Sequence, residues 1–301
     1  MNIFLALSSA LATAVYYVYL SRAMKRTPGL SSSFTLATSH LSGALALLPV
    51  WLMYSTPVSF DAIGTIATPM LLAAALLVLS RELYFYAYAR TDVANITVFS
   101  ALTPIYAIGT GYVMLGEVPT PTALTGMLLI CASIYGLFLK RRAGMPLIAA
   151  ILLPFRHIIV SLPIFCAFLS TIPTALASAY QKQLLHTLSP ISFSFFLLAL
   201  IGLAAMVISA SALTSRGLAA QFRLLPRHFL LISAIMLPLM HVLFSMVMQH
   251  QQTAVSLILQ RTSIMFQILL SYIFLHERRE PRKRIITTLL ILCGFGLIIA
   301  K

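Results

Sequence analysis

Long apolar stretches, each about the length of one membrane crossing, follow one another along the chain and are separated by short polar segments. A helix that crosses the hydrocarbon core of a bilayer needs roughly 20 predominantly apolar residues. The segments between the stretches are too short to fold as soluble domains, so any function must lie among the helices. The pattern predicts ten membrane-spanning helices, at about residues 2–21, 31–54, 66–88, 93–115, 121–140, 158–181, 190–213, 229–250, 254–276 and 284–300.

The second half of the chain repeats the first at a distance of 160 residues. Residues 114–122 read MLGEVPTPT and residues 274–282 read FLHERREPR, so each copy has a Glu followed four residues later by a Pro. We therefore predict two five-helix halves, residues 1–142 and 157–301. Because five is an odd number, the second half enters the membrane from the opposite side and is inverted relative to the first. The aligned pairs include Tyr112 with Tyr272, Glu117 with Glu277, Pro121 with Pro281 and Gly136 with Gly296.

The composition also indicates an integral membrane protein, because 60% of the residues are hydrophobic, 9% are charged and the mean hydropathy is +0.98. Six acidic residues in a chain of 301 cannot cover the surface of a soluble core. The first apolar stretch has no basic n-region and no convincing cleavage site, so we interpret it as a retained helix. Cys131, Cys166 and Cys293 lie within apolar stretches and are interpreted as packing residues, which suggests neither a disulfide framework nor a metal site.

The net charge of +14 comes from short basic clusters between the spans, a pattern typical of membrane proteins and not of nucleic-acid binding. Of the 20 Lys and Arg residues, Arg81 and Arg261 lie inside spans and Lys182 and Lys301 lie on one face. The remaining sixteen follow odd-numbered spans. We therefore predict that these basic loops are cytoplasmic, that both termini are non-cytoplasmic, and that the membrane is a bacterial inner membrane.

The stretch 94–139, ANITVFSALTPIYAIGTGYVMLGEVPTPTALTGMLLICASIYGLFL, resembles the repeat of the drug/metabolite transporter superfamily, in its EamA-like branch. It shares a start rich in small residues, a mid-helix Pro104, an LGE corner and a return helix that contains glycine. In the second copy, 254–300, Ile264 replaces the proline and His276 replaces the glycine before Glu. The resemblance implies an all-α fold of ten transmembrane helices in two inverted five-helix repeats around a central cavity, and transport of small metabolites. Members of this family are expected to have cytoplasmic termini, whereas the charges predict the reverse.

Ionisable residues inside the spans are candidates for function because a charge within the hydrocarbon region is costly. At the 160-residue offset Arg81 aligns with His241, and equivalent positions of two such halves approach the axis where substrate sites form. His40 is interpreted as a helix-contact residue. Glu82 is the single deep carboxylate in the sequence, and is therefore the candidate for proton coupling. In a structural interpretation it pairs with Arg261; in a functional one a cation binds a substrate carboxylate or phosphate, and Glu82 binds an amine or a proton.

Polar neighbours extend the candidate site. Arg81 shares a helix face with Tyr84 and Tyr88. These tyrosines form either an interfacial aromatic belt or a vestibule for an aromatic or cationic substrate. Pro104 lacks an N–H group, so its helix can bend and serve as a gate. The predicted substrate-binding residues are Arg81, Glu82, Tyr84, Tyr88, His241, Gln260, Arg261 and Gln267, the two glutamines lying two turns apart on one face of their helix.

We predict a secondary transporter or exporter of small organic metabolites, in particular amino-acid-like zwitterions, that works by alternating access with proton coupling through Glu82. No P-loop is present, so ATP coupling is not expected, and neither is a cofactor or metal. An intramembrane enzyme would need paired acids, a histidine cluster or a nucleophile with its base, and the sequence shows no such set. The expected partners are a small-molecule substrate and the lipid bilayer, and the chain is expected to be a monomer, with a weak dimer as the alternative.

Three alternatives stay open. Within the same class, the substrate is an organic anion or phosphorylated metabolite, or it is an organic cation held by tyrosines and Glu82. From another class, a lipid flippase or scramblase would need a lateral groove open to lipid in place of a closed cavity.

Overall fold

The structure is a computed structural model that describes residues 3–27, 29–55, 60–88, 90, 99, 102–138, 146, 148, 151–152, 161–213, 215–274 and 281–299. Every regular element in these residues is a helix, as an integral membrane protein of this composition requires. The helices are α1 (Ile3–Arg26), α2 (Ser32–Tyr54), α3 (Phe60–Tyr88), α5 (Thr103–Leu115), α6 (Pro121–Phe138), α8 (Leu162–Leu169), α9 (Thr171–Leu184), α10 (Pro190–Ala212), α11 (Ser215–Leu224), α12 (Arg227–His250), α13 (Thr253–Arg261), α14 (Ser263–Phe274) and α15 (Pro281–Ile299).

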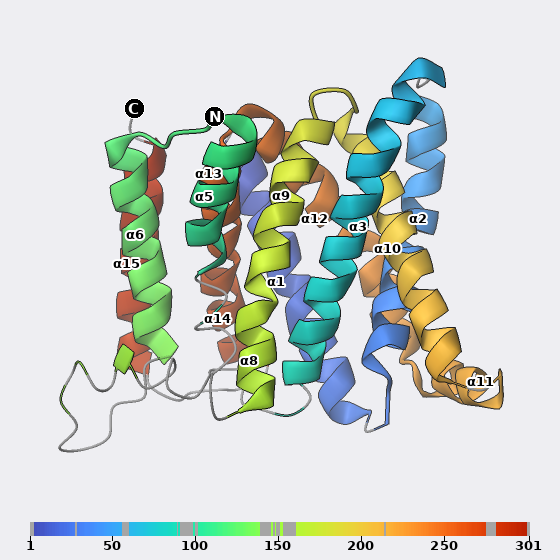
Figure 1. Ribbon diagram of the computed structural model, residues 1–301. Helices are drawn as coiled ribbons and strands as arrows, with labels where there is room; N and C mark the ends of the chain where they lie inside the picture. Colours follow the sequence, from blue (N-terminus) through green and yellow to red (C-terminus); the bar gives the residue numbers. More distant parts are fainter. Residues whose placement is uncertain are drawn as a thin grey trace.

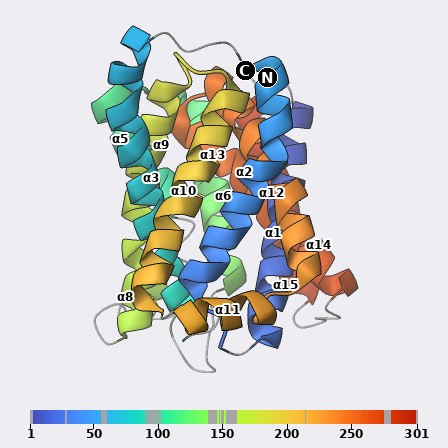
Figure 2. The ribbon, with the colours of Figure 1, turned by 90° about the vertical axis from the view of Figure 1, so that its right-hand side faces the viewer.

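The long helices stand side by side in one bundle (Figure 1). α1 begins and α15 ends at the same end of that bundle, whereas the short helix α11 lies across the opposite end (Figure 2). Large apolar side chains such as those of Val113 and Val207 are 81% and 69% exposed, which is favourable in lipid and costly in water. The chain is therefore an integral membrane protein.

Within the described residues, six helical stretches are long and apolar enough to cross a membrane, and they coincide with six of the predicted spans. The four remaining predicted spans, 93–115, 121–140, 254–276 and 284–300, all include residues outside the described part, and the helices seen there are shorter. The six stretches are Ile3–Met24, Ser32–Tyr54, Ile63–Ala87, Leu162–Leu184, Pro190–Ala212 and Arg227–His250.

Two helix pairs approach closely because glycines lie where the helices cross. α6 packs against α15, and a Cβ atom added to Gly126 would lie 2.5 Å from the carbonyl oxygen of Gly294. α2 packs against α10, and a Cβ atom added to Gly202 would lie 2.8 Å from Cγ of Leu41. Small residues of this kind allow the backbones of membrane helices to touch.

Within the described residues, helices are interrupted at two places in the predicted spans. α8 ends at Leu169, four residues before Pro173, and a proline ring clashes with the carbonyl group of the fourth residue before it. α13 ends before Thr262, whose N–H bonds to the carbonyl of Leu259, three residues back, at 3.1 Å. Such a bond tightens the chain locally and ends the regular α-helix.

Pro104, where the sequence predicts a bend, lies in the first turn of α5. Backbone N–H groups in the first turn have no carbonyl partner within the helix, so the lack of an N–H in proline costs no hydrogen bond there. Leu102 precedes this helix, and its N–H bonds to the carbonyl of Phe99 at 2.9 Å. Leu102 aligns with Thr262 at the 160-residue offset, so α5 and α14 begin at equivalent positions although the second copy has Ile264 in place of the proline.

The LGE corner ends α5 and caps another helix. Gly116 has a left-handed backbone conformation, with φ of 67°, which glycine adopts without strain. Glu117 follows, and its Oε2 accepts a hydrogen bond of 2.7 Å from the backbone N–H of Thr253, at the start of α13. A carboxylate is favourable at a helix N-terminus. The equivalent Glu277 lies outside the described residues.

Lys182 caps the C-terminal end of a helix. Its Nζ donates hydrogen bonds to the carbonyl oxygens of Met248, Gln249 and Gln251, at 2.6, 3.1 and 2.9 Å. These carbonyls belong to the C-terminal end of α12, where a cation also interacts favourably with the helix dipole. The ammonium group is buried with all three of its donors satisfied.

The hydropathy pattern did not predict α11. Its Gln221 accepts a hydrogen bond of 2.7 Å from the N–H of Ser31 and donates one of 2.9 Å to the carbonyl of Gly29. The rings of Phe222 and Phe34 meet edge to face, with centroids 4.8 Å apart. These contacts attach α11 to the loop that joins α1 and α2 and to the first turn of α2.

Candidate functional site

A cavity of about 160 Å³ lies among α1, α3, α5, α9, α12, α13 and α14. One water molecule occupies roughly 10–15 Å³ of such a cavity, so there is room for about a dozen waters, or for one small metabolite. Both interruptions, at Ser170 and at Thr262, lie beside it, because Ser170, Thr171, Arg261 and Ser263 line its wall. Discontinuous helices commonly form the substrate sites of transporters.

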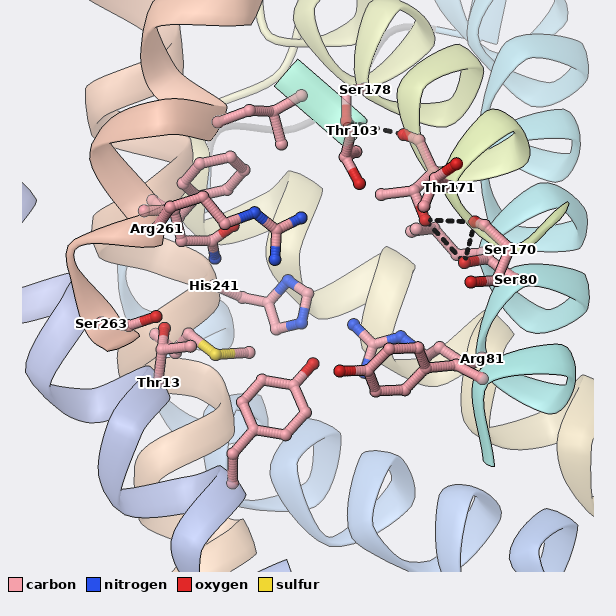
Figure 3. Close-up of a pocket in the computed structure, with 18 of the residues that line it drawn as sticks. Thr13, Ser80, Arg81, Thr103, Ser170, Thr171, Ser178, His241, Arg261 and Ser263 are labelled. Carbon is pink, nitrogen blue, oxygen red and sulfur yellow. Dashed lines mark hydrogen bonds between the residues drawn. The ribbon is translucent and has the colours of Figure 1, made fainter. Parts of the chain in front are cut away.

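Two arginines and a histidine enter the cavity from separate elements. Arg81 comes from α3, His241 from α12 and Arg261 from the end of α13, and Figure 3 shows all of them pointing into one space. His241 is 7% exposed. Its Nε2 and the Nε of Arg261 are buried and have no hydrogen-bond partner among the described residues. The lining residues that the structure describes include no carboxylate. The cavity is therefore a cationic site.

Glu82 is not among the lining residues. Its Oε2 accepts a hydrogen bond of 2.8 Å from the hydroxyl of Ser33 on α2, and its Oε1 is buried without a partner in the described part of the chain. Neighbouring residues on a helix point about 100° apart, which explains why Arg81 reaches the cavity and Glu82 reaches α2. Arg261 lines the cavity instead of contacting Glu82 at the α2 side.

Six of the eight predicted substrate-binding residues line this one cavity: Arg81, Tyr84, His241, Gln260, Arg261 and Gln267. Glu82 faces α2, and the side chain of Tyr88 lies outside the described residues. Pro104 adjoins the lining residue Thr103.

His40 lies behind His241, with the ring centroids 6.4 Å apart. It is fully buried, and its Nδ1 is 2.9 Å from the carbonyl oxygen of Leu36 and 3.2 Å from the hydroxyl of Ser39. Both of these partners belong to its own helix, α2, and the ring contact with His241 reaches α12. The Nε2 of His40 has no partner among the described residues.

Sequence reasoning did not select the hydroxyl groups on the other side of the cavity. The set consists of Ser80, Ser170, Thr171, Thr174 and Ser178, and it is called the hydroxyl wall below. A signal for it does exist in the sequence, because Ser170, Thr174 and Ser178 recur every four residues in an apolar stretch and so share one helix face. Such a polar stripe faces either a cavity or another helix.

Comparison with known proteins agrees with this architecture. The sequence profile of the EamA-like transporter family matches residues 1–139 and again residues 161–300. A solved crystal structure, described only as that of a protein, superposes with a TM-score of 0.69 at 13% sequence identity, over 98% of this chain and 94% of that chain, which shows a shared fold. No curated protein matches the chain. The chain belongs to the EamA-like transporter family of the drug/metabolite transporter superfamily, whose members carry small molecules across membranes.

Proposed function

We propose that this protein is a secondary transporter of small organic anions that works by alternating access. The observation that carries the proposal is a cavity lined by Arg81 and Arg261 and by no carboxylate among its described residues. A buried cation is costly unless it is paired, and a substrate carboxylate or phosphate is the partner that an arginine fork fits best. The charge on the substrate would then balance the charge of its site.

Two inverted halves of five helices each, residues 1–142 and 157–301, make up the proposed ten-helix transporter. The packing supports this, because α2 packs on α10, α6 packs on α15, and the contact of α3 with α9 has a counterpart in that of α12 with α1. The first two pairs each join an element to its own equivalent at the 160-residue offset, and the contacts of α3 with α9 and of α12 with α1 are equivalent to each other at that offset. An in-plane twofold axis between inverted repeats produces such pairs, and it places the site near the midplane.

The position of Glu82 favours an anion over the zwitterion expected from the sequence. A zwitterion needs an acceptor for its ammonium group, and the single deep carboxylate contacts Ser33 on α2. An amino-acid-like zwitterion is the second candidate, because Gln260 and Gln267 both line the cavity and each carries an acceptor oxygen.

Proton coupling is proposed to act through Glu82. The Oε1 atom of this carboxyl group is buried and has no partner in the described part of the chain, so this oxygen is available to take up a proton. Its contact with α2 would make the α2–α3 interface the element that responds to protonation.

The proposed orientation places α11 at the cytoplasmic side and both termini on the other side. α11 and the first turn of α12 carry the exposed residues Arg223 and Arg227, at the end of the bundle opposite to the start of α1 and the end of α15 (Figure 2). Lys and Arg in short loops are retained on the cytoplasmic face.

A thermal-stability screen of the purified protein tests the substrate class. Carboxylates and phosphorylated metabolites should raise the melting temperature, because a ligand present at 100 times its Kd adds about 2.7 kcal/mol to the stability of the folded state. Arg81→Gln and Arg261→Gln should remove the effect, and Arg223→Gln on exposed α11 should keep it. Stabilisation by quaternary amines alone, or an undiminished anion effect in Arg261→Gln, would refute the proposal.

A further inference from the structure

The hydroxyl wall faces Arg261 across the cavity. Figure 3 shows Ser80, Ser170 and Thr171 on one side of the space and Arg261 on the other, with His241 between them. Ser80 comes from α3, and the other members come from α9 and the residue before it. A substrate held at Arg261 would therefore extend toward these hydroxyl groups.

Each hydroxyl group has a single proton to donate, and in three members of the wall that proton is bound to a helix carbonyl. The hydroxyl of Ser170 donates to the carbonyl of Ala167 at 2.7 Å, and that of Thr171 donates to Phe168 at 2.7 Å. The hydroxyl of Ser178 donates to the carbonyl of Thr174 at 2.8 Å. None of these three retains a donor for a ligand.

The protons of Ser80 and Thr174 are also engaged. Oγ of Ser80 lies 2.7 Å from the carbonyl oxygen of Ser170 and 2.6 Å from Oγ1 of Thr174. Oγ1 of Thr174 lies 3.0 Å from the same carbonyl oxygen. Whichever hydroxyl donates to the other, both protons remain within this group of atoms. The whole wall therefore presents oxygen lone pairs to the cavity and no hydrogen-bond donors.

The cavity is thus divided by hydrogen-bonding character. Arg81 and Arg261 carry donors only, so they bind the acceptor oxygens of an anionic group. The hydroxyl wall carries acceptors only, so it binds donors on the remainder of the substrate. A purely apolar chain would leave the free lone pairs of the wall oxygens without donors and would forgo the hydrogen bonds that a substrate donor can make with them.

Substrate hydroxyl groups fit this wall better than a substrate ammonium group. An ammonium would add a third positive charge beside two arginines, and the described lining residues include no carboxylate to balance it. Hydroxyl groups supply the same donors without charge. The cavity volume of about 160 Å³ suits a chain of four to six carbons, roughly the dozen non-hydrogen atoms that a dozen waters replace.

We infer that the substrate is a hydroxylated organic acid, with its anionic group at Arg81 and Arg261 and its hydroxyl groups on the hydroxyl wall. The inference rests on the proposed anion transport and goes beyond it in naming what the other end of the substrate carries. It assigns the specificity for the substrate chain to Ser80, Thr174 and Ser178.

Two matched pairs of acids test the inference by binding to the purified full-length protein. Gluconate and hexanoate share a six-carbon monocarboxylate chain, and tartrate and succinate share a four-carbon dicarboxylate chain; only the first of each pair has hydroxyl groups. The hydroxylated member should bind about tenfold more tightly or better, as two additional hydrogen bonds imply. Equal affinities within both pairs would overturn the inference and leave anion transport standing. Binding of neither pair would overturn both proposals.

Variants of the hydroxyl wall test whether its oxygen atoms bind the hydroxyl groups of the substrate. Ser178→Ala and Thr174→Val remove acceptor oxygens, so each should lower the gluconate affinity several-fold and leave the hexanoate affinity unchanged. Ser211→Ala is the matched control, because its hydroxyl also donates to a helix carbonyl, that of Ile208 at 2.8 Å, but it is exposed on α10. A folded Ser178→Ala protein that still prefers gluconate by the same factor as the wild type would overturn the role of the wall.

Discussion

At the scale of single residues, Lys182 shows how a charge is stabilised inside the bundle. Its ammonium group donates to three carbonyls at the end of α12, and replacement by methionine would remove these three hydrogen bonds. We expect Lys182→Met to lower the free energy of unfolding by about 2–4 kcal/mol, since hydrogen bonds to a charged group are stronger than neutral ones. Thermal melting in detergent measures the loss.

Arg227→Met is the control for this prediction. It removes one positive charge from the other end of the same helix, where a cation is unfavourable and the side chain is exposed. Its melting temperature should equal or exceed that of the wild type. Equal melting temperatures for Lys182→Met and the wild type would show that the three hydrogen bonds do not stabilise the fold.

Two variants distinguish a role of Glu82 in proton transfer from a purely structural role. Gln at this position keeps an acceptor for the Ser33 hydroxyl and cannot release a proton, so Glu82→Gln should fold normally and lose proton-driven uptake in reconstituted vesicles. Ser33→Ala removes the same hydrogen bond and keeps the carboxyl group, so it should retain proton-driven uptake. Wild-type uptake by Glu82→Gln would end the assignment of Glu82.

The sequence indicates the charged part of the candidate site and not its hydroxyl part. A charge within a span is costly, so Arg81 and Arg261 stand out, and both line the cavity. Ser170 and Ser178 donate to carbonyls of their own helix, so their burial costs little and gives no comparable signal. The partners of Lys182 lie 66 to 69 residues away and depend on tertiary packing.

At the scale of elements, the crossing of α6 and α15 depends on glycine. A Cβ atom at Gly126 would meet the carbonyl oxygen of Gly294 at 2.5 Å, and a backbone atom cannot move aside as a flexible side chain can. We expect Gly126→Ala to separate the helices and to lower the free energy of unfolding by about 2–3 kcal/mol, measured by thermal melting.

Gly136 provides the matched control on the same helix. A Cβ atom there would have no neighbour within 4 Å, so Gly136→Ala should leave the melting temperature unchanged or raise it slightly through its better helix propensity. If both variants have the same melting temperature as the wild type, the α6–α15 contact is not as close as described.

Hydropathy predicts long helices well and short or interrupted ones poorly. A stretch such as Pro190–Ala212 is apolar on all sides and has length enough to span a bilayer, so its position follows from composition alone. α11 has only ten residues, with arginine among its apolar positions, and its docking depends on contacts of Gln221 with a distant loop. The interruption at Thr262 has no proline to mark it.

At the scale of the whole molecule, the proposed orientation rests on the distribution of charge. Ile3, the first residue of α1, and Arg223, in α11, are exposed. The start of α1 and the helix α11 lie at opposite ends of the bundle (Figure 2). In a variant whose native cysteines are replaced by alanine, Ile3→Cys should react with an impermeant maleimide from the external side and Arg223→Cys from the cytoplasmic side. Reaction of Ile3→Cys from the cytoplasmic side alone would show that the charge argument is wrong and that the termini follow the expectation for the family.

The most direct test of the central claim is the accessibility of the cavity from both sides of the membrane. Gln267 is half-buried in the cavity wall, and Val207 is 69% exposed on the outer surface of α10. Without native cysteines, Gln267→Cys should react with an impermeant maleimide in both right-side-out and inverted vesicles, and a bound anion should slow the reaction. Val207→Cys, in lipid, should not react. Reaction of Gln267→Cys from one side only, under every condition, would contradict alternating access.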